Sequence, residues 1–380
     1  MSKKKHNKHA KHAKRQETVY LNVFERLLKE RTFLIFIGIA FIAAGFATLN
    51  WRVSMWFGFA FTAYAAVAND SIQSLGTFIE SNKHRKWWVL WLFTGGILIA
   101  TLTFSYIYYD GDVTYHRLID DAGNTKYPQP TQFSYFQLIA PLVLIILTRL
   151  RMPVSTTFLL LSVFSADTSG ISSVVFKSVT GYGLAFIVSF AVWALSYSVI
   201  KKYFSMRKAH NGWAVAQWII SGSLWAVWLM QDGANIAVYL PRKLELYQFI
   251  IFTGVIFIGM ALLFYLRGDK IQGVVSEKKG IADVRAATLI DFTYVILLVY
   301  KLFVSPIPLS TTWVFLGIIG GREVAISLLR KKLGHGHKVQ ALRLIGKDFL
   351  YAFIGLIISL VLALGANPSI RAEIAASLGW

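Results

Sequence analysis

Long apolar stretches alternate with short polar connections along most of the chain. Because a helix needs about 20 apolar residues to cross the hydrocarbon core of a bilayer, stretches of this order predict membrane-spanning helices. They lie at 33–49, 53–68, 87–109, 133–149, 179–200, 213–230, 247–266, 289–304 and 349–365. Two more apolar segments, 153–166 and 308–329, are interrupted by Pro, Ser, Thr and Gly. The pattern predicts an all-α polytopic membrane protein.

The composition agrees with this prediction. The chain has 380 residues, of which 56% are hydrophobic and 15% charged, whereas soluble domains are about 45–50% apolar and about 25% charged. Its 12 Trp, 17 Tyr and 28 Phe suit aromatic belts at the two bilayer surfaces. The absence of cysteine excludes disulfides and thiolate metal sites.

The net charge of +20 is concentrated between the apolar stretches. The first 32 residues hold ten Lys and Arg. Five connections hold most of the other Lys and Arg. There are 3 in 79–87, 2 in 149–152, 4 in 201–212, 5 in 267–288 and 6 in 330–348. Basic connections are typical of the cytoplasmic side, so we expect no nucleic acid partner and a multi-pass protein of the cell membrane, in bacteria the inner membrane.

This charge distribution also predicts a topology. If every basic connection is cytoplasmic, the chain must cross between 153 and 178 and again between 308 and 330. The total is then about eleven crossings, with the N-terminus inside and the C-terminus outside. A re-entrant hairpin at either place would change the count, and that alternative stays open.

Two motifs recur in the same order. VANDSIQSLGT (67–77) and LMQDGANIAVY (229–239) each carry a carboxylate between two amides. PVSTT begins 83 residues after the first aspartate, and PLSTT begins 76 residues after the second. The repeated pair of motifs indicates two related halves, whereas a single STT triplet would carry little information.

The halves define the expected organisation of the chain. If the charge distribution sets the topology, the first half starts outside and the second starts inside, so the halves are inverted repeats of five segments with broken helices or hairpins. Inverted repeats of this kind are a recurrent plan of secondary transporters. The expected parts are a basic cytoplasmic tail (1–32), an extra transmembrane helix (33–50), repeat 1 (51–204), a cytoplasmic linker (205–212), repeat 2 (213–366) and a C-terminal tail (367–380).

The aspartate motifs have the chemistry of a cation site. An ionised aspartate inside a spanning helix costs about 2.5–3.5 kcal/mol, so it requires a bound cation, a proton or a partner from another helix. Amide oxygens beside it suit a hard cation such as sodium. Small neighbouring residues would also permit local unwinding, which exposes backbone carbonyls. The candidate cation ligands are Asn69, Asp70, Gln73, Gln231, Asp232 and Asn235.

The Ser-Thr-Thr triplets have the opposite chemistry. Their hydroxyls donate hydrogen bonds, and each triplet follows a Pro that can begin a helix, whose free N–H groups attract anions. Such residues can also simply link helices, but their repetition favours an oxyanion site. The candidate substrate ligands are Ser155, Thr156, Thr157, Ser310, Thr311 and Thr312. A cation between carboxylate and anion would couple their binding.

These stretches resemble the inorganic phosphate transporter (PiT) family, whose halves carry GANDVANxxGT-like and P-x-STT motifs. The first motif matches at Asn69, Asp70, Gly76 and Thr77, and the second at Asp232 and Asn235. The resemblance implies a central phosphate site with adjoining sodium or proton sites built from the residues above, and no other cofactor. The family's amides before and after the aspartates are Gln231 and Gln73 here, and its His after STT is Phe158 or Trp313.

The expected function is a cation-coupled symporter of phosphate or a related oxyanion, working by alternating access between the halves in contact with membrane lipids. A membrane-embedded enzyme and a non-transporting anion receptor are the alternatives. The sequence has no P-loop, HExxH or GxSxG motif, so we expect no enzyme. A homodimer stays open. Asp283 and Asp291 flank the start of a cytoplasmic helix and are expected to interact with its dipole only.

Overall fold

The regular elements of the structure are helices. The computed structural model describes residues 30–119, 127, 129–165, 168–204, 209–268, 272–276, 281–304, 310–329 and 335–377. The first half contains α2 (Arg31–Ala47), α3 (Trp51–Ser81), α4 (Trp87–Tyr108), α5 (Tyr135–Arg149), a π-helical turn η1 (Thr157–Leu161), a 3₁₀ turn η2 (Ser162–Phe164) and α6 (Thr168–Phe204). The second contains α7 (Asn211–Ala237), α8 (Leu246–Tyr265), α9 (Gly273–Ser276), α10 (Val284–Val304), α11 (Thr311–Leu329), α12 (His335–Ala366) and α13 (Pro368–Ser377).

The predicted all-α polytopic fold is confirmed. Among the described residues, seven helices are long and apolar enough to cross a membrane. These spans lie in α4, α6, α7, α8, α10, α11 and α12. The apolar helices α2 and α5 are shorter, with 17 and 15 residues. The eleven crossings and their directions stay a prediction, and the basic tail up to residue 29 lies outside the described residues.

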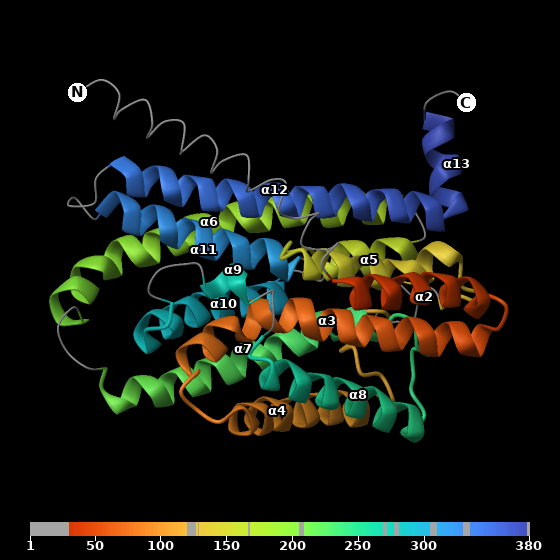
Figure 1. Cartoon of the computed structure of the whole chain (residues 1–380), viewed down its shortest axis with the longest axis horizontal. Helices are drawn as coiled ribbons and strands as arrows, with labels where there is room; N and C mark the ends of the chain where they lie inside the picture. Colours follow the sequence, from red (N-terminus) through yellow and green to blue (C-terminus); the bar gives the residue numbers. More distant parts are fainter. Residues whose placement is uncertain are drawn as a thin grey trace.

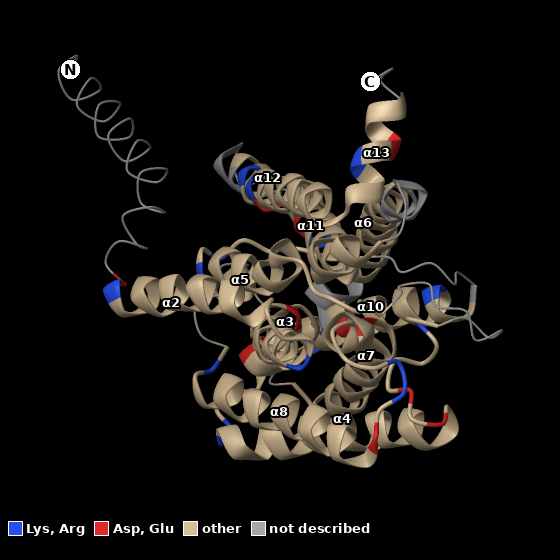
Figure 2. Cartoon of the chain, turned by 90° about the vertical axis from the view of Figure 1, so that its right-hand side faces the viewer, with Lys and Arg blue, Asp and Glu red and all other residues tan. Residues whose placement is uncertain are grey.

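Most of the helices run side by side along the long axis of the molecule (Figure 1). Seen end-on, α3, α7 and α10 occupy the middle (Figure 2). The pair α4 and α8 covers one side, and α6, α11 and α12 cover the opposite side. Helix α3, at 31 residues, contacts α5, α7 and α8. The central helices therefore present polar residues to one another, shielded by the outer helices.

The helix contacts occur in matched pairs between the two halves. Helix α3 packs on α5 and α8 as α7 packs on α10 and α4. Helix α6 packs on α11 as α12 packs on η1 and η2, and α5 contacts α12 as α10 contacts α6. Exchanging each element with its counterpart leaves these contacts unchanged. The pattern supports two related halves, while their exact boundaries and inverted orientation stay predictions.

Helices α6 and α11 approach closely because two glycines line their interface. A Cβ atom built on Gly317 would lie 2.5 Å from the Tyr182 carbonyl oxygen, and one on Gly321 would lie 2.2 Å from that of Phe186. The Ser189 hydroxyl donates to the Ile318 carbonyl oxygen over 2.6 Å. The Gly-x-x-x-Gly spacing is typical of closely packed membrane helices. It joins the end of the first half to the interrupted segment of the second.

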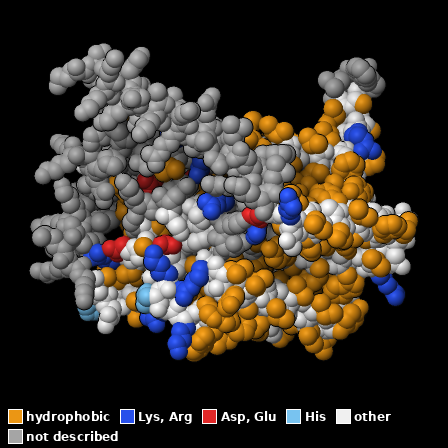
Figure 3. Space-filling view, in the orientation of Figure 1, with side chains coloured by type: hydrophobic (Ala, Val, Ile, Leu, Met, Phe, Trp, Pro, Cys, Tyr) orange, Lys and Arg blue, Asp and Glu red, His pale blue; other side chains and the backbone are white. Residues whose placement is uncertain are grey.

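The surface separates into an apolar part and a charged end. In Figure 3 hydrophobic side chains cover the right-hand part of the visible face, while Lys and Arg gather toward the left. Two of the basic connections contact each other, because Arg267 donates to the carbonyl oxygens of Lys83 and Arg85 over 2.5 and 3.2 Å. Arg151 from a third connection lines the same cavity as Lys83 and Arg267. Three connections that the charge pattern assigns to one side therefore lie together.

Candidate functional site

The two aspartates lie on the central helices α3 and α7 and are fully buried, with 0% and 1% of Asp70 and Asp232 exposed. Both helices are continuous through these positions, to Ser81 and Ala237. The expectation that the chain unwinds beside the aspartates is therefore wrong. Nearby Gly76 serves packing instead, because a Cβ there would lie 2.8 Å from a methyl group of Val275.

Each Ser-Thr-Thr triplet stands at a helix start, as predicted. The Ser155 hydroxyl accepts a hydrogen bond from the Phe158 backbone N–H over 3.1 Å, and Ser310 does the same for Trp313 over 3.3 Å. These are N-cap contacts, which satisfy an otherwise free N–H group. In the first half the helical turns begin after Ser155 and not at Pro153, and Pro308 lies outside the described residues. The serines therefore cap the helix starts, and the threonines begin them.

The middle threonine of each triplet donates to one aspartate. The Thr156 hydroxyl lies 2.6 Å from Asp70 Oδ2, and the Thr311 hydroxyl lies 2.5 Å from Asp232 Oδ2. The two contacts occupy equivalent positions in the two repeats. Each repeat thus brings its acidic motif and its hydroxyl motif together, although they are about 80 residues apart in sequence.

A bridge from the second half joins the two carboxylate groups. The Asn235 amide nitrogen donates to the hydroxyls of Thr156 and Thr157 over 3.0 and 3.3 Å. Thr157 in turn lies 3.5 Å from Asp232 Oδ1. Asp70 and Asp232 are also close enough to repel each other. The structure therefore brings both predicted motif pairs into one cluster.

Three more of the predicted residues, Asn69, Thr312 and Gln231, bond to backbone carbonyl oxygens near this cluster. The Asn69 amide nitrogen donates to Asp70 and to the Val154 carbonyl oxygen, each over 2.7 Å. Thr312 donates to the same carbonyl oxygen over 3.2 Å. Gln231 donates to the Leu298 carbonyl oxygen over 2.8 Å. The Val154 carbonyl oxygen, just before the first triplet, therefore accepts one hydrogen bond from each half.

Four amide side chains leave their oxygens unused. These buried oxygens accept no hydrogen bond from the described residues, and they belong to Asn69, Gln73, Gln231 and Asn235. Buried acceptors are normally satisfied, so four of them within the two aspartate motifs require an explanation. Oxygen atoms of amides and carboxylates are the ligands of hard cations. No three His, Cys, Asp or Glu gather to hold a metal within the described part of the chain.

Sequence analysis missed a basic contribution to the site. Lys301 of α10 is 1% exposed and interacts electrostatically with Asp232. Arg117, half-buried in the connection after α4, interacts with the same aspartate. The sequence does hold a signal for this residue, because Lys301 is a charged residue inside the apolar stretch 289–304. Only the tertiary structure shows which aspartate it faces.

Asp291 was assigned to a helix dipole, and this interpretation is wrong. The residue lies inside α10 and is 1% exposed. Its carboxylate accepts hydrogen bonds from Thr77 of α3 and from Ser221 of α7, the latter over 2.6 Å. Asp291 therefore links three central helices.

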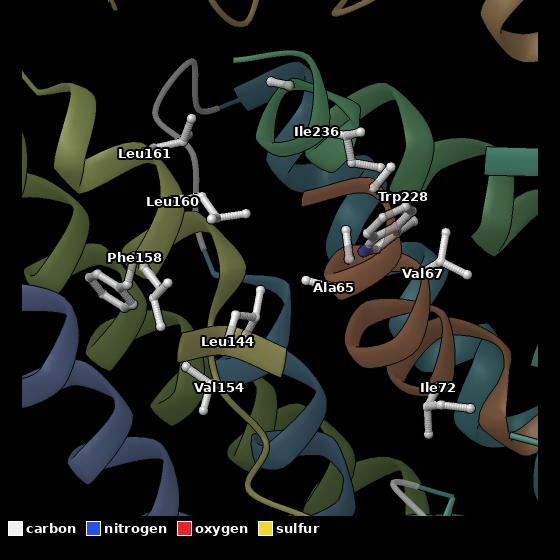
Figure 4. Close-up of a cluster of buried hydrophobic side chains, with 14 of the residues drawn as sticks. Ala65, Val67, Ile72, Leu144, Val154, Phe158, Leu160, Leu161, Trp228 and Ile236 are labelled. Carbon is white, nitrogen blue, oxygen red and sulfur yellow. The ribbon is translucent and has the colours of Figure 1, made fainter. Parts of the chain in front are cut away.

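The segments that carry the cluster also carry buried apolar side chains. Figure 4 shows Val154, Phe158 and Leu160 from the first triplet segment, with Trp228 and Val67 from α7 and α3. All five are at most 5% exposed. Such surroundings strengthen electrostatic interactions, because little water is present to screen them.

Comparison with known proteins identifies one solved structure with the same fold. No protein-family model matches the chain, and no curated protein matches it. The solved structure is described as "The sodium-dependent phosphate transporter" and superposes with a TM-score of 0.54 at 16% sequence identity. The match covers 84% of this chain and 97% of the other. The chain therefore has the fold of this sodium-dependent phosphate transporter, a PiT-like fold as the motifs predict.

Proposed function

We propose that this protein is a secondary transporter that carries inorganic phosphate, or a related oxyanion, together with sodium ions or protons. One observation carries the proposal. Two buried aspartates from the two halves each accept a hydrogen bond from a threonine at a helix start, and Asn235 links the threonines of the first start. The two aspartate motifs also hold four buried amide oxygens without donors among the described residues. The fold shared with a sodium-dependent phosphate transporter supports the same conclusion.

The cation would bind between a carboxylate and the unused amide oxygens. Asp70 has two such oxygens nearby in its motif, those of Asn69 and Gln73. A cation there would satisfy these acceptors and offset the negative charge at once. Sodium fits because it takes hard oxygen ligands. A proton on the carboxylate would offset the charge without using the amides.

Cation binding would prepare the site for the anion through the threonine hydroxyls. In the structure Thr156 and Thr311 direct their protons toward the aspartates. A cation on a carboxylate would compete for the same oxygen atoms, so the hydroxyl could turn and donate to a phosphate oxygen. The bound cation would also remove the repulsion between carboxylate and anion. Each effect makes anion binding depend on the cation, which is the definition of coupling.

The paired contacts of the two halves suit alternating access. The cluster lies where α3 and α7 meet, and the helix starts of η1 and α11 reach it from opposite repeats. Movement of one repeat against the other would open the cluster to either side in turn. This mechanism is common among transporters with repeated halves.

The test is uptake of radiolabelled phosphate into proteoliposomes under imposed sodium or proton gradients, with sulfate as competitor. We expect gradient-driven uptake that falls at least tenfold in Asp70→Asn and in Asp232→Asn. The control is Asp110→Asn, because the Asp110 side chain is 90% exposed and pairs with an exposed lysine, Lys243. Uptake that is unaffected by either aspartate substitution would refute the site.

The same preparation separates the alternatives. Phosphate binding by calorimetry without flux under any gradient would identify an anion receptor. Chemical turnover of a substrate without net transport would identify an enzyme. Either result would replace the proposed function.

A further inference from the structure

The two halves differ in one respect, which is the charge around their aspartates. Lys301 and Arg117 both interact electrostatically with Asp232. The groups that act on Asp70 are Asp232, Thr156 and Asn69, and no lysine or arginine among the described residues is one of them. The equivalent carboxylates of the two repeats therefore lie in different electrostatic environments.

Helix α10 places Lys301 on the face that lines the cluster. On that face the Tyr294 hydroxyl donates to the Thr311 carbonyl oxygen over 2.8 Å. One turn later the Leu298 carbonyl oxygen accepts from Gln231, the neighbour of Asp232. Residues 294, 298 and 301 follow the three- and four-residue spacing of one helix face. The hydrogen bonds at the first two positions thus direct the third toward the same site.

Lys301 is 1% exposed on a spanning helix, so its charge requires a local partner. Asp232 is a carboxylate that attracts this charge electrostatically. An ammonium group carries the charge of a sodium ion and interacts with the same oxygen ligands, by donating hydrogen bonds in place of coordination. It differs in being fixed to the protein.

We propose that the Lys301 ammonium stands in for one coupling cation beside Asp232, so that a transport cycle takes up its cation only beside Asp70. The inference rests on the proposed function and makes it more specific. Arg117 lies in the connection after α4, and this connection is bonded to the one after α7, because the Leu244 N–H donates to the Gly111 carbonyl oxygen over 2.9 Å. Lys301 and Arg117 together balance the two negative charges of Asp70 and Asp232 before any ion binds. One bound cation then gives the site the net positive charge that an anion requires.

The test compares the full-length protein with Lys301→Met, which removes the charge and keeps most of the length of the side chain. Lys301→Arg keeps the charge, and Lys243→Met removes an exposed lysine whose side chain is 61% accessible. Reversal potentials in proteoliposomes give the number of cations moved with each phosphate. Binding of ²²Na⁺ to the purified protein counts the ions directly.

We expect one cation per phosphate in the wild type, in Lys301→Arg and in Lys243→Met. Lys301→Met should need at least tenfold more sodium for half-maximal uptake and should bind one more ²²Na⁺ per chain than the wild type. An unchanged sodium requirement and an unchanged count in Lys301→Met would overturn the inference.

The wild type alone also decides the question if Lys301→Met does not fold. Two or more cations per phosphate in the wild type would overturn the inference and leave the proposed function standing. A wild type that moves no phosphate under any gradient would overturn both.

Discussion

At the scale of single residues, the threonine hydroxyls are as important to the cluster as the aspartates. Each middle threonine has the same donor role in its repeat, but Thr156 has an additional contact. It donates to Asp70 and accepts from Asn235, whereas Thr311 donates to Asp232. The first threonine therefore joins the two halves, and the second acts within its own half.

This difference predicts an order of effects for the isosteric substitutions Thr156→Val and Thr311→Val. Each removes a hydrogen bond to a charged group, worth about 1.5–3 kcal/mol. We expect both to raise the phosphate concentration for half-maximal uptake, and Thr156→Val to have the larger effect. The control is Thr180→Val, whose hydroxyl donates to the Phe176 carbonyl oxygen on an exposed part of α6. Equal effects for all three variants would contradict the prediction.

Asp291 supports the site from a distance along α10. Its carboxylate accepts two hydrogen bonds from buried hydroxyls, those of Thr77 and Ser221. Asn at this position can still bond to both hydroxyls, because a hydroxyl can donate or accept. Leu can bond to neither, and each unsatisfied buried group costs about 1–3 kcal/mol.

We therefore expect Asp291→Leu to lower the thermal unfolding temperature of the detergent-solubilised protein clearly, and Asp291→Asn to lower it much less. Nanoscale differential scanning fluorimetry of both variants measures this difference. A loss of the same size in both would show that the negative charge itself stabilises the helices.

At the scale of helices, the closest packing lies between α6 and α11. Gly321 allows it, since any Cβ atom there would overlap the Phe186 carbonyl oxygen at 2.2 Å. The overlapping atom belongs to the backbone, so a side-chain rotation cannot relieve the contact. Gly96 of α4 is a matched contrast, because a Cβ there meets no atom within 4 Å.

The contrast gives opposite expectations for the same substitution. Gly321→Ala should destabilise the protein by about 1–3 kcal/mol, the typical cost of overpacking a core. Gly96→Ala should be neutral or stabilising by up to about 1 kcal/mol, because Ala favours helix more than Gly. Thermal unfolding of the two variants beside the wild type provides the measurement. Equal stability of both would mean that α6 and α11 can separate without cost.

At the scale of the whole molecule, the two ends of the helix bundle are expected to face opposite sides of the membrane. The natural absence of cysteine allows a direct test, because single cysteines can be introduced without removing others. Lys83 belongs to the connection from α3 to α4, at the left of Figure 1, whereas Lys243 belongs to the connection from α7 to α8 and Ala372 to α13, both at the right. All three positions are exposed.

With about eleven crossings and a cytoplasmic N-terminus, Lys243→Cys and Ala372→Cys should react with an impermeant maleimide on intact cells. Lys83→Cys should react only after the membrane is opened. Labelling of all three only after opening would reject this topology. Labelling of Lys83→Cys alone on intact cells would show the reverse orientation.

The amino-acid sequence by itself determined the class of protein and most of the candidate site. Apolar length sets which segments become helices, and the repetition of two motifs identified the aspartates, threonines and Asn235 that the structure gathers in one cluster. These signals are local, so they survive without knowledge of the packing.

Tertiary structure decided what depends on contacts between distant segments. Continuous helices replaced the expected unwound turns, because neighbouring helices supply the cluster with side-chain partners. Lys301 and Arg117 stand far from Asp232 in the sequence, and only packing brings their charges to it. Asp291 was expected beside a helix start, but it lies buried inside α10 and links α10 to α3 and α7. Charge in a poorly screened interior acts through space, and spatial proximity is the property that one-dimensional patterns do not contain.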